Sequence, residues 1–258
     1  MGLIQTGKVA TLLLELAFCA AILVLIARAR AGRKVPVIRK VAGLEAIDEA
    51  VGRATEMGAT VHFAPGLGAI NNAQTLAAMA VLSHVARICA KYDTRLIQTN
   101  CDNVVYSIAE EVVKQAYVEA GKSDEFNPDD VRFISQDQFG YASGCVGIMN
   151  REKVRANILI GAFWAESLIF AEVGSQVGSI QIAGTANTHQ IPFFIAACDY
   201  ALLGEEIYAA SAYLSREPVL VGCLIGQDWG KMVGVLLILL GSVLATANST
   251  WLGDVLNK

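Results

Sequence analysis

The chain has 258 residues, of which 54% are hydrophobic and only 17% are charged, and its net charge at pH 7 is −4. Soluble domains average about 45–50% apolar and about 25% charged residues, so this composition excludes an ordinary soluble protein and favours one partly embedded in a membrane. The negative net charge argues against nucleic acid as a partner.

The first expected element is an apolar segment near the N-terminus. Residues 9–27, VATLLLELAFCAAILVLIA, are long enough to cross a hydrocarbon core of about 30 Å as a helix. A cleaved signal peptide is the alternative, but Lys8 is the one early cation and Glu15 interrupts the apolar run. We therefore favour a membrane anchor. Glu15, an ionisable residue inside that anchor, is a candidate functional residue.

Strands and helices are expected to alternate after this segment. Apolar positions recur at helical spacing over residues 44–58, and a short strand follows over residues 60–63. A helix over 73–91, a strand over 94–99 and a helix capped by Asp102 come next. This alternation predicts an α/β domain with a mostly parallel central sheet.

The second half of this domain has a less regular pattern. Residues 151–174 are strongly apolar and are predicted to form one long helix. Within them, residues 157–171 are also considered as a third membrane segment, but about 15 residues that include Glu166 are more typical of a buried core helix. Two shorter apolar runs, residues 178–184 and 191–204, are expected as buried strands or turns.

A second membrane segment is predicted near the C-terminus. MVGVLLILLGSVLATA, residues 232–247, is uncharged and lies between Trp229 and Trp251, and aromatic residues are typical of the two membrane interfaces. Its small residues favour packing against another membrane helix. The apolar run just before it, residues 218–226, is expected to belong to the α/β domain.

The basic residues predict the orientation of the chain. RARAGRKVPVIRK, residues 28–40, follows the first segment, and the positive-inside rule places such a cluster in the cytoplasm. Both chain ends are then outside the plasma membrane. We predict an N-terminal transmembrane anchor with its basic flank at 1–34, a cytoplasmic α/β domain at 35–228, and a C-terminal transmembrane helix with a short outside tail at 229–258.

A glycine-containing loop is the strongest candidate for a binding site. In VHFAPGLGAINNAQT, residues 61–75, a strand, a glycine loop and a helix follow one another, as in many phosphate-binding sites. Gly66, Gly68, Asn71 and Asn72 are therefore candidate residues for binding a nucleotide or another anion. The loop lacks the last glycine of the dinucleotide fingerprint and the lysine of a P-loop, so a plain turn capped by Asn71 or Asn72 is the alternative.

Other chemistry-bearing residues form no known motif. The six cysteines contain no C-x-x-C pair, the three histidines lack metal-binding spacing, and no G-x-S-x-G motif is present. We therefore predict no metal, no cofactor and a role other than catalysis. Polar residues in apolar surroundings mark a possible second site, composed of Glu166, Asp199, Glu205, Glu206 and His189.

Long phrases of the sequence resemble a known but uncharacterised family. The phrases are RAGRKVPVIRKVAGLEAIDEAVGRATEMGATVHFAPGLG, EKVRANILIGAFWAESLIFAEVG and QIAGTANTHQIPFFIAACDYALLGEEIYAASAYLS, together with the final membrane segment. The family, defined by a domain of unknown function, comprises prokaryotic membrane-anchored proteins. The resemblance implies a membrane anchor and a cytoplasmic α/β domain over nearly the whole chain. It implies no activity, cofactor or catalytic residue.

Three functional hypotheses follow. The apolar excess extends beyond the two membrane segments, which favours a structural or scaffolding protein that self-assembles into a homo-oligomer through its cytoplasmic domain. One alternative is a nucleotide- or anion-sensing module that uses the Gly66–Asn72 loop. Another is an oligomeric channel or transporter component with Glu15 in its lumen. The expected partners are membrane lipid and further copies of the chain.

Overall fold

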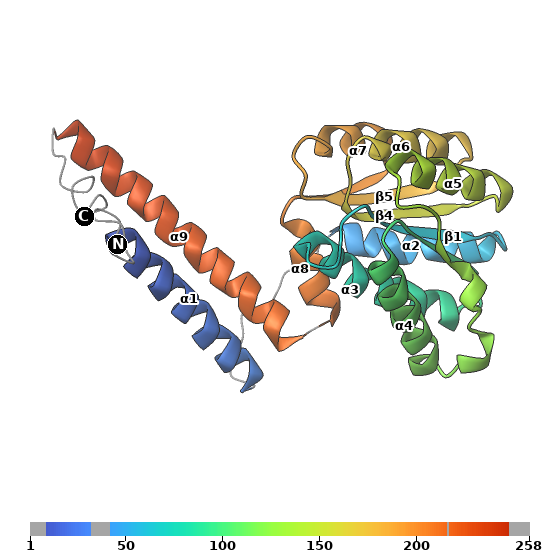
Figure 1. Cartoon of the computed structure of the whole chain (residues 1–258), viewed down its shortest axis with the longest axis horizontal. Coiled ribbons are helices and arrows are strands. Elements are labelled where there is room, and N and C mark those ends of the chain that lie inside the picture. The colour runs from blue at the N-terminus through green and yellow to red at the C-terminus, as the bar shows by residue number, and fades with distance from the viewer. Residues whose placement is uncertain (1–8, 32–41, 216, 248–258) are drawn as a thin grey trace. The chain divides into compact units, whose positions relative to one another are not determined.

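The computed structural model describes residues 9–31, 42–215 and 217–247 (Figure 1). The chain divides into two compact units, one formed by Met1–Val37 with Arg216–Lys258 and the other by Ile38–Ser215. The second unit is the α/β domain. The basic residues at 33–40 and the C-terminal tail, on which the predicted orientation partly rests, lie outside the described residues.

A parallel sheet forms the centre of the α/β domain. Within residues 42–215, six strands pair in the order β3-β2-β1-β4-β5-β6, and every neighbouring pair is parallel. This confirms the predicted α/β class. The strands are β1 (Val61–Gly66), β2 (Leu96–Asn100), β3 (Val131–Phe133), β4 (Ala156–Ala162), β5 (Ile180–Thr185) and β6 (Tyr200–Leu203).

Helices cover both faces of the sheet, as parallel sheets require (Figure 1). One face packs against α2 (Ala42–Glu56), α3 (Ala73–Lys91), α4 (Asn103–Glu119) and α8 (Glu206–Ser215). The other face packs against α5 (Gln138–Arg151), α6 (Glu166–Gln176) and α7 (Ile191–Ala197). Two short 3-10 turns, η1 (Ser123–Glu125) and η2 (Pro128–Asp130), connect α4 to β3.

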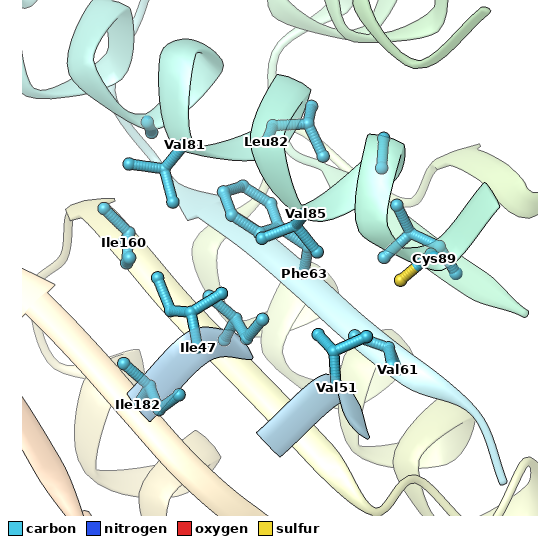
Figure 2. Close-up of a cluster of buried hydrophobic side chains, with 14 of the residues drawn as sticks. Ile47, Val51, Val61, Phe63, Val81, Leu82, Val85, Cys89, Ile160 and Ile182 are labelled. Atoms are coloured by element: carbon cyan, nitrogen blue, oxygen red, sulfur yellow. The ribbon is translucent and has the colours of Figure 1, made fainter. Parts of the chain in front are cut away.

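The larger of two hydrophobic clusters lies between the sheet and helices α2 and α3. Val61 and Phe63 of β1 point into it because alternate residues of a strand face the same side. Figure 2 shows both side chains among residues of the neighbouring elements. Those residues include Ile47 and Val51 of α2, Val81, Leu82, Val85 and Cys89 of α3, and Ile160 and Ile182 of the adjoining strands.

The prediction of one helix over residues 151–174 is wrong. Residues 156–162 form β4, and α6 begins only at Glu166. Every residue of β4 is buried because β4 lies inside the sheet with helices on both faces. Such a strand is apolar throughout, and periodicity cannot distinguish it from a buried helix. Residues 157–171 therefore form a strand, a turn and the start of a helix rather than a third membrane helix.

Helix α5 is absent from the sequence-based prediction. Its segment, QFGYASGCVGIMNR, contains Gly140, Gly144 and Gly147, and glycine is a poor helix former. Tertiary contacts offset this cost, because Tyr141, Cys145 and other residues of α5 are buried against the sheet.

The two terminal helices are long, apolar and exposed. Helix α1 spans Val9–Arg30 and helix α9 spans Pro218–Thr246, so residues 218–226 and the predicted membrane segment belong to one continuous helix. Both helices satisfy the length and hydropathy of a membrane span while burying almost none of it. Helix α3 satisfies the same two criteria, but most of it is buried in the α/β domain. The exposed apolar surfaces of α1 and α9 therefore point to membrane anchoring.

Candidate functional site

The order of the strands reverses between β1 and β4. From β1 the chain continues outward to β2 and β3, and it then returns to β4 on the other side of β1. The segment after β1 leads to α3 on one face, and the segment after β4 leads to α6 on the other face. Doubly wound sheets with this order bind ligands in the crevice at the carboxyl ends of these two strands. This crevice is the candidate site.

Glycines allow β1 and β4 to meet closely at the crevice. Gly66 has a φ of 79°, and a Cβ atom on it would lie 2.2 Å from the carbonyl oxygen of Ala162. Gly161 has a φ of 146°, and a Cβ atom there would lie 2.0 Å from the carbonyl oxygen of Pro65. The amide of Leu67 donates to the Ala162 carbonyl at 2.8 Å, which fastens the start of the loop to β4. The role of Gly66 is therefore to let the backbones of β1 and β4 approach each other closely.

Asn72 begins helix α3. It has extended dihedral angles, with φ −82° and ψ 127°, and its Oδ1 accepts a hydrogen bond from the Gln74 amide at 2.9 Å. This is the cap expected as the alternative to an anion site. Asn71 is exposed in the preceding turn. The N-terminus of α3 carries positive partial charge, and the Asn72 side chain already accepts a hydrogen bond from one of the amides in its first turn.

Thr75 is buried in the first turn of α3 beside Gly68. Its Oγ1 is the one buried side-chain polar atom without a hydrogen-bond partner in the part of the chain that the structure describes. A Cβ atom on Gly68 would lie 2.4 Å from this oxygen, so the hydroxyl points at the glycine loop. An unsatisfied buried hydroxyl costs about 1–3 kcal/mol, and native structures retain such a group through strain, for a functional role, or where a ligand or water completes it.

Gln74 connects α3 to the loops after β5 and β4. Its Oε1 accepts hydrogen bonds from the Ala186 amide at 2.7 Å and from the Thr185 hydroxyl at 3.2 Å. Its Nε2 donates to Asn187 Oδ1 at 3.0 Å, and Asn187 Nδ2 donates to the Phe163 carbonyl at 2.6 Å. These bonds hold three loops around the crevice. Gln74 is not among the predicted site residues, and its one signal in the sequence is a polar residue two positions after the helix cap Asn72.

Glu166 is fully buried at the start of α6 and is completely bonded. Its Oε1 accepts from the Trp164 amide at 2.9 Å, and its Oε2 accepts from Gln138 Nε2 at 2.6 Å. A carboxylate at a helix N-terminus is also stabilised by the helix dipole. Glu166 therefore links the starts of α5 and α6 at the same edge of the sheet as the crevice.

The other members of the predicted polar site lie at two different edges. His189 is exposed in the loop after β5, and Glu205 and Glu206 follow β6, so these three share the carboxyl edge with Glu166. Glu206 Oε2 accepts from the Leu203 amide at 2.9 Å and closes the turn there. Asp199 precedes β6 and accepts from the Gln181 amide at 2.7 Å, so it lies at the opposite, amino edge.

The loops at the carboxyl edge carry no lysine or arginine. This holds for residues 67–72, 101–102, 134–137, 163–165, 186–190 and 204–205. Two acidic residues in these loops serve as helix caps. Asp102 accepts from the Val104 and Val105 amides, and Asp137 accepts from the Gly140 amide. An anion bound here would therefore depend on backbone N–H groups, hydroxyl groups and the dipole of α3.

Neither a ribose-binding acid nor a metal site is found among residues 9–31, 42–215 and 217–247. Dinucleotide-binding folds place an acidic residue near the end of β2. Here Asn100 ends β2 and is buried in hydrogen bonds with Gln98, while Asp102 caps α4. No group of three or more His, Cys, Asp or Glu side chains lies together to hold a metal ion in that part of the chain.

Comparison with known proteins identifies a family for the chain without a function. The family model described as "Domain of unknown function (DUF6754)" matches residues 1–256, so the chain belongs to this family. This confirms the family resemblance of the sequence. No curated protein and no solved structure matches the chain.

Proposed function

We propose that this member of the family is a membrane-anchored binding protein whose α/β domain holds a small anionic ligand, such as a nucleotide, between the ends of β1 and β4. The observation that carries the proposal is the unpaired hydroxyl of Thr75, which is buried and faces Gly68. The strand order and the N-terminus of α3 support the same position. We therefore rank ligand sensing above self-assembly.

The charge of the site restricts the ligand. A helix N-terminus carries about half a positive charge, and the surrounding loops add no lysine or arginine. A ligand with one or two negative charges, such as a nucleoside monophosphate or a dinucleotide, suits this environment better than a free triphosphate. We expect its phosphate to accept hydrogen bonds from the Thr75 hydroxyl and from the loop amides.

A thermal-shift panel on the full chain in mild detergent tests this function. The panel contains nucleoside mono-, di- and triphosphates, dinucleotides, inorganic phosphate and small carboxylates. A true ligand at 100 times its Kd should add about 2.7 kcal/mol of stability, which raises the Tm by about 5–10 °C. Failure of every compound to stabilise the protein would overturn the proposal.

Two variants locate the binding site. Thr75→Val keeps the shape of the side chain and removes the hydroxyl, so the ligand should bind at least about tenfold more weakly. Gly68→Val should abolish binding, because its side chain would occupy the space beside Thr75 Oγ1. Thr55→Val is the matched control, because its hydroxyl bonds Thr94 at the amino edge of the sheet. Equal ligand-induced shifts in the wild type and in Thr75→Val would argue that the ligand binds elsewhere.

Self-assembly through the α/β domain is the second candidate function. Phe193 and Ile195 of α7 and Tyr200 and Leu203 of β6 are large, apolar and exposed, and β6 is an edge strand of the sheet. Exposed apolar patches and open strand edges favour association. Mass photometry in detergent should show an oligomer that Ile195→Lys dissociates and that Val118→Lys, on exposed α4 surface, leaves intact. A monomeric wild type would exclude this function.

We also propose that the α/β domain faces the cytoplasm, with both chain ends outside the plasma membrane. Arg28 and Arg30 in the last turn of α1 support this orientation, together with the basic residues that follow in the sequence. Protease added to intact cells should then spare the α/β domain and remove an epitope tag placed after Lys258. Digestion of the domain in intact cells would contradict this topology.

A further inference from the structure

Trp164 lies beside the crevice, in the turn that joins β4 to α6. This turn follows Ala162, whose Cβ atom would lie 2.9 Å from a Cβ atom added to Gly68. Two fully extended residues span at most about 7 Å, so the backbone of Trp164 lies no farther than that from the backbone of Ala162. Trp164 is therefore a neighbour of the glycine loop at the carboxyl edge of the sheet.

The backbone of Trp164 is held by hydrogen bonds on both sides. In the peptide group that joins it to Phe163, the carbonyl oxygen accepts from Asn187 Nδ2 at 2.6 Å, and the amide donates to Glu166 Oε1 at 2.9 Å. The carbonyl oxygen of Trp164 itself accepts from the Ser167 amide at 3.1 Å. Side chains of two other segments therefore fix the position from which the indole ring extends.

The same hydrogen bonds connect Trp164 to the first turn of α3. Asn187, which bonds the peptide group before Trp164, accepts from Gln74 Nε2 at 3.0 Å. Gln74 directly precedes Thr75, whose buried hydroxyl has no partner among the described residues. The Thr75 hydroxyl and the Trp164 backbone are therefore held at fixed positions relative to each other, as a preorganised binding site requires.

The side chain of Trp164 is 44% exposed although its backbone is completely bonded. A single exposed apolar side chain is ordinary on a protein surface. Here, however, Leu76 and Leu168 are also exposed, in the first turns of α3 and α6 on opposite faces of the sheet. The loops at this edge carry no lysine or arginine. The edge therefore suits a ligand that combines an anionic group with a flat apolar ring.

We propose that the indole ring of Trp164 is the surface on which the base of a bound nucleotide stacks, while the phosphate lies between Thr75 and the glycine loop. This inference rests on the anion-binding function proposed above and specifies its ligand. Aromatic side chains stack with every nucleobase, because each base has a π face. The site therefore requires a base but discriminates only weakly between one base and another.

Calorimetric titration of the full chain in mild detergent with adenosine monophosphate and with ribose 5-phosphate tests the stacking. Both compounds carry the same phosphate, and only the first has a base, so the wild type should bind it at least about tenfold more tightly. Trp164→Ala should remove this preference without changing the affinity for ribose 5-phosphate, whereas Trp164→Phe, which keeps an aromatic ring, should retain most of it. Tyr92→Ala is the matched control, because Tyr92 is an exposed aromatic residue at the other end of α3.

Tryptophan fluorescence reports on the ring directly. The chain contains three tryptophans, so a variant with Trp229→Phe and Trp251→Phe retains Trp164 alone. A base stacked on the indole ring should quench its emission as adenosine monophosphate is added, with the same Kd that calorimetry gives. Ribose 5-phosphate, which has no base, should leave the emission nearly unchanged. Binding of adenosine monophosphate without quenching would overturn the stacking.

The titrations separate failure of the stacking from failure of the anion-binding function. Equal wild-type affinities for the two compounds would overturn the stacking and leave the anion-binding function intact. A preference for adenosine monophosphate that survives in Trp164→Ala would place the base elsewhere, and an equal loss of both affinities in that variant would assign Trp164 a structural role. Binding of neither compound would overturn the anion-binding function and the stacking together.

Discussion

The Nδ1 atom of His62 lies 2.8 Å from Oδ1 of Asn157, and both side chains are fully buried. The amide oxygen can only accept, so His62 donates through Nδ1 and accepts at Nε2 from the Thr99 hydroxyl at 3.0 Å. Asn157 Nδ2 donates in turn to Gln181 Oε1 at 3.2 Å. A chain of hydrogen bonds therefore crosses β2, β1, β4 and β5. Each bond in it is donated by the residue on the β2 side to the residue on the β5 side.

The buried His62 should make the stability of the α/β domain fall in mild acid. Burial lowers the pKa of His62 from 6.5 to about 4, and the hydrogen bond to Asn157 opposes this shift only in part. The unfolded chain binds a proton below pH 6.5, whereas the folded chain stays neutral until about pH 4. The free energy of unfolding should therefore decrease between these pH values, by up to about 3 kcal/mol.

Denaturant unfolding of the wild type and of His62→Gln between pH 8 and pH 4 measures this effect. The variant should lose the part of the pH dependence that belongs to His62, although it is less stable at pH 7. Identical slopes in the two proteins between pH 6.5 and pH 4 would show that His62 does not titrate as its burial requires.

Thr75 and Thr99 should respond in opposite ways to the same substitution. Thr99→Val leaves Nε2 of buried His62 without its donor, which should cost about 1–3 kcal/mol. Thr75→Val removes a hydroxyl that has no partner, so the ligand-free protein should keep its stability or gain slightly. Chemical denaturation compares the two variants. A large loss in Thr75→Val would mean that its hydroxyl already contributes to folding.

Gly66 and Gly52 provide a second matched pair. Gly66→Ala should destabilise the domain by more than about 2 kcal/mol, because φ is 79° and the new Cβ would collide with the Ala162 carbonyl. Gly52 lies inside α2 with no atom within 4 Å of an added Cβ, so Gly52→Ala should stabilise by about 0.5–1 kcal/mol. Thermal unfolding distinguishes the two, and equal effects would contradict the close approach of β1 and β4.

Gln74→Leu should loosen the loops around the crevice. The variant leaves the Ala186 amide without its acceptor and Oδ1 of Asn187 without its donor, at a cost of about 1–3 kcal/mol. Hydrogen exchange followed by mass spectrometry should show faster exchange of residues 185–190, while β2 exchanges as in the wild type. Unchanged exchange in that loop would show that Gln74 does not hold it.

Local patterns in the sequence determined much of the α/β framework. The bounds of α3 at 73 and 91, and the caps at Asn72 and Asp102, follow from helical periodicity and from side chains that bond nearby amides. The two exposed terminal helices follow from long apolar runs. Each of these features depends on residues that lie close together in the chain, so a single sequence contains all the information needed to predict it.

Tertiary structure alone decided β4 and the polar contacts of the site. The apolar run of β4 is a strand because two neighbouring strands, β1 and β5, and two helical layers bury it, which no local period reveals. Gln74 meets Asn187, 113 residues later in the chain, and Asp199 lies at the opposite edge of the sheet from Glu166. The unpaired hydroxyl of Thr75 likewise arises from packing, because burial and partners depend on segments far apart in sequence.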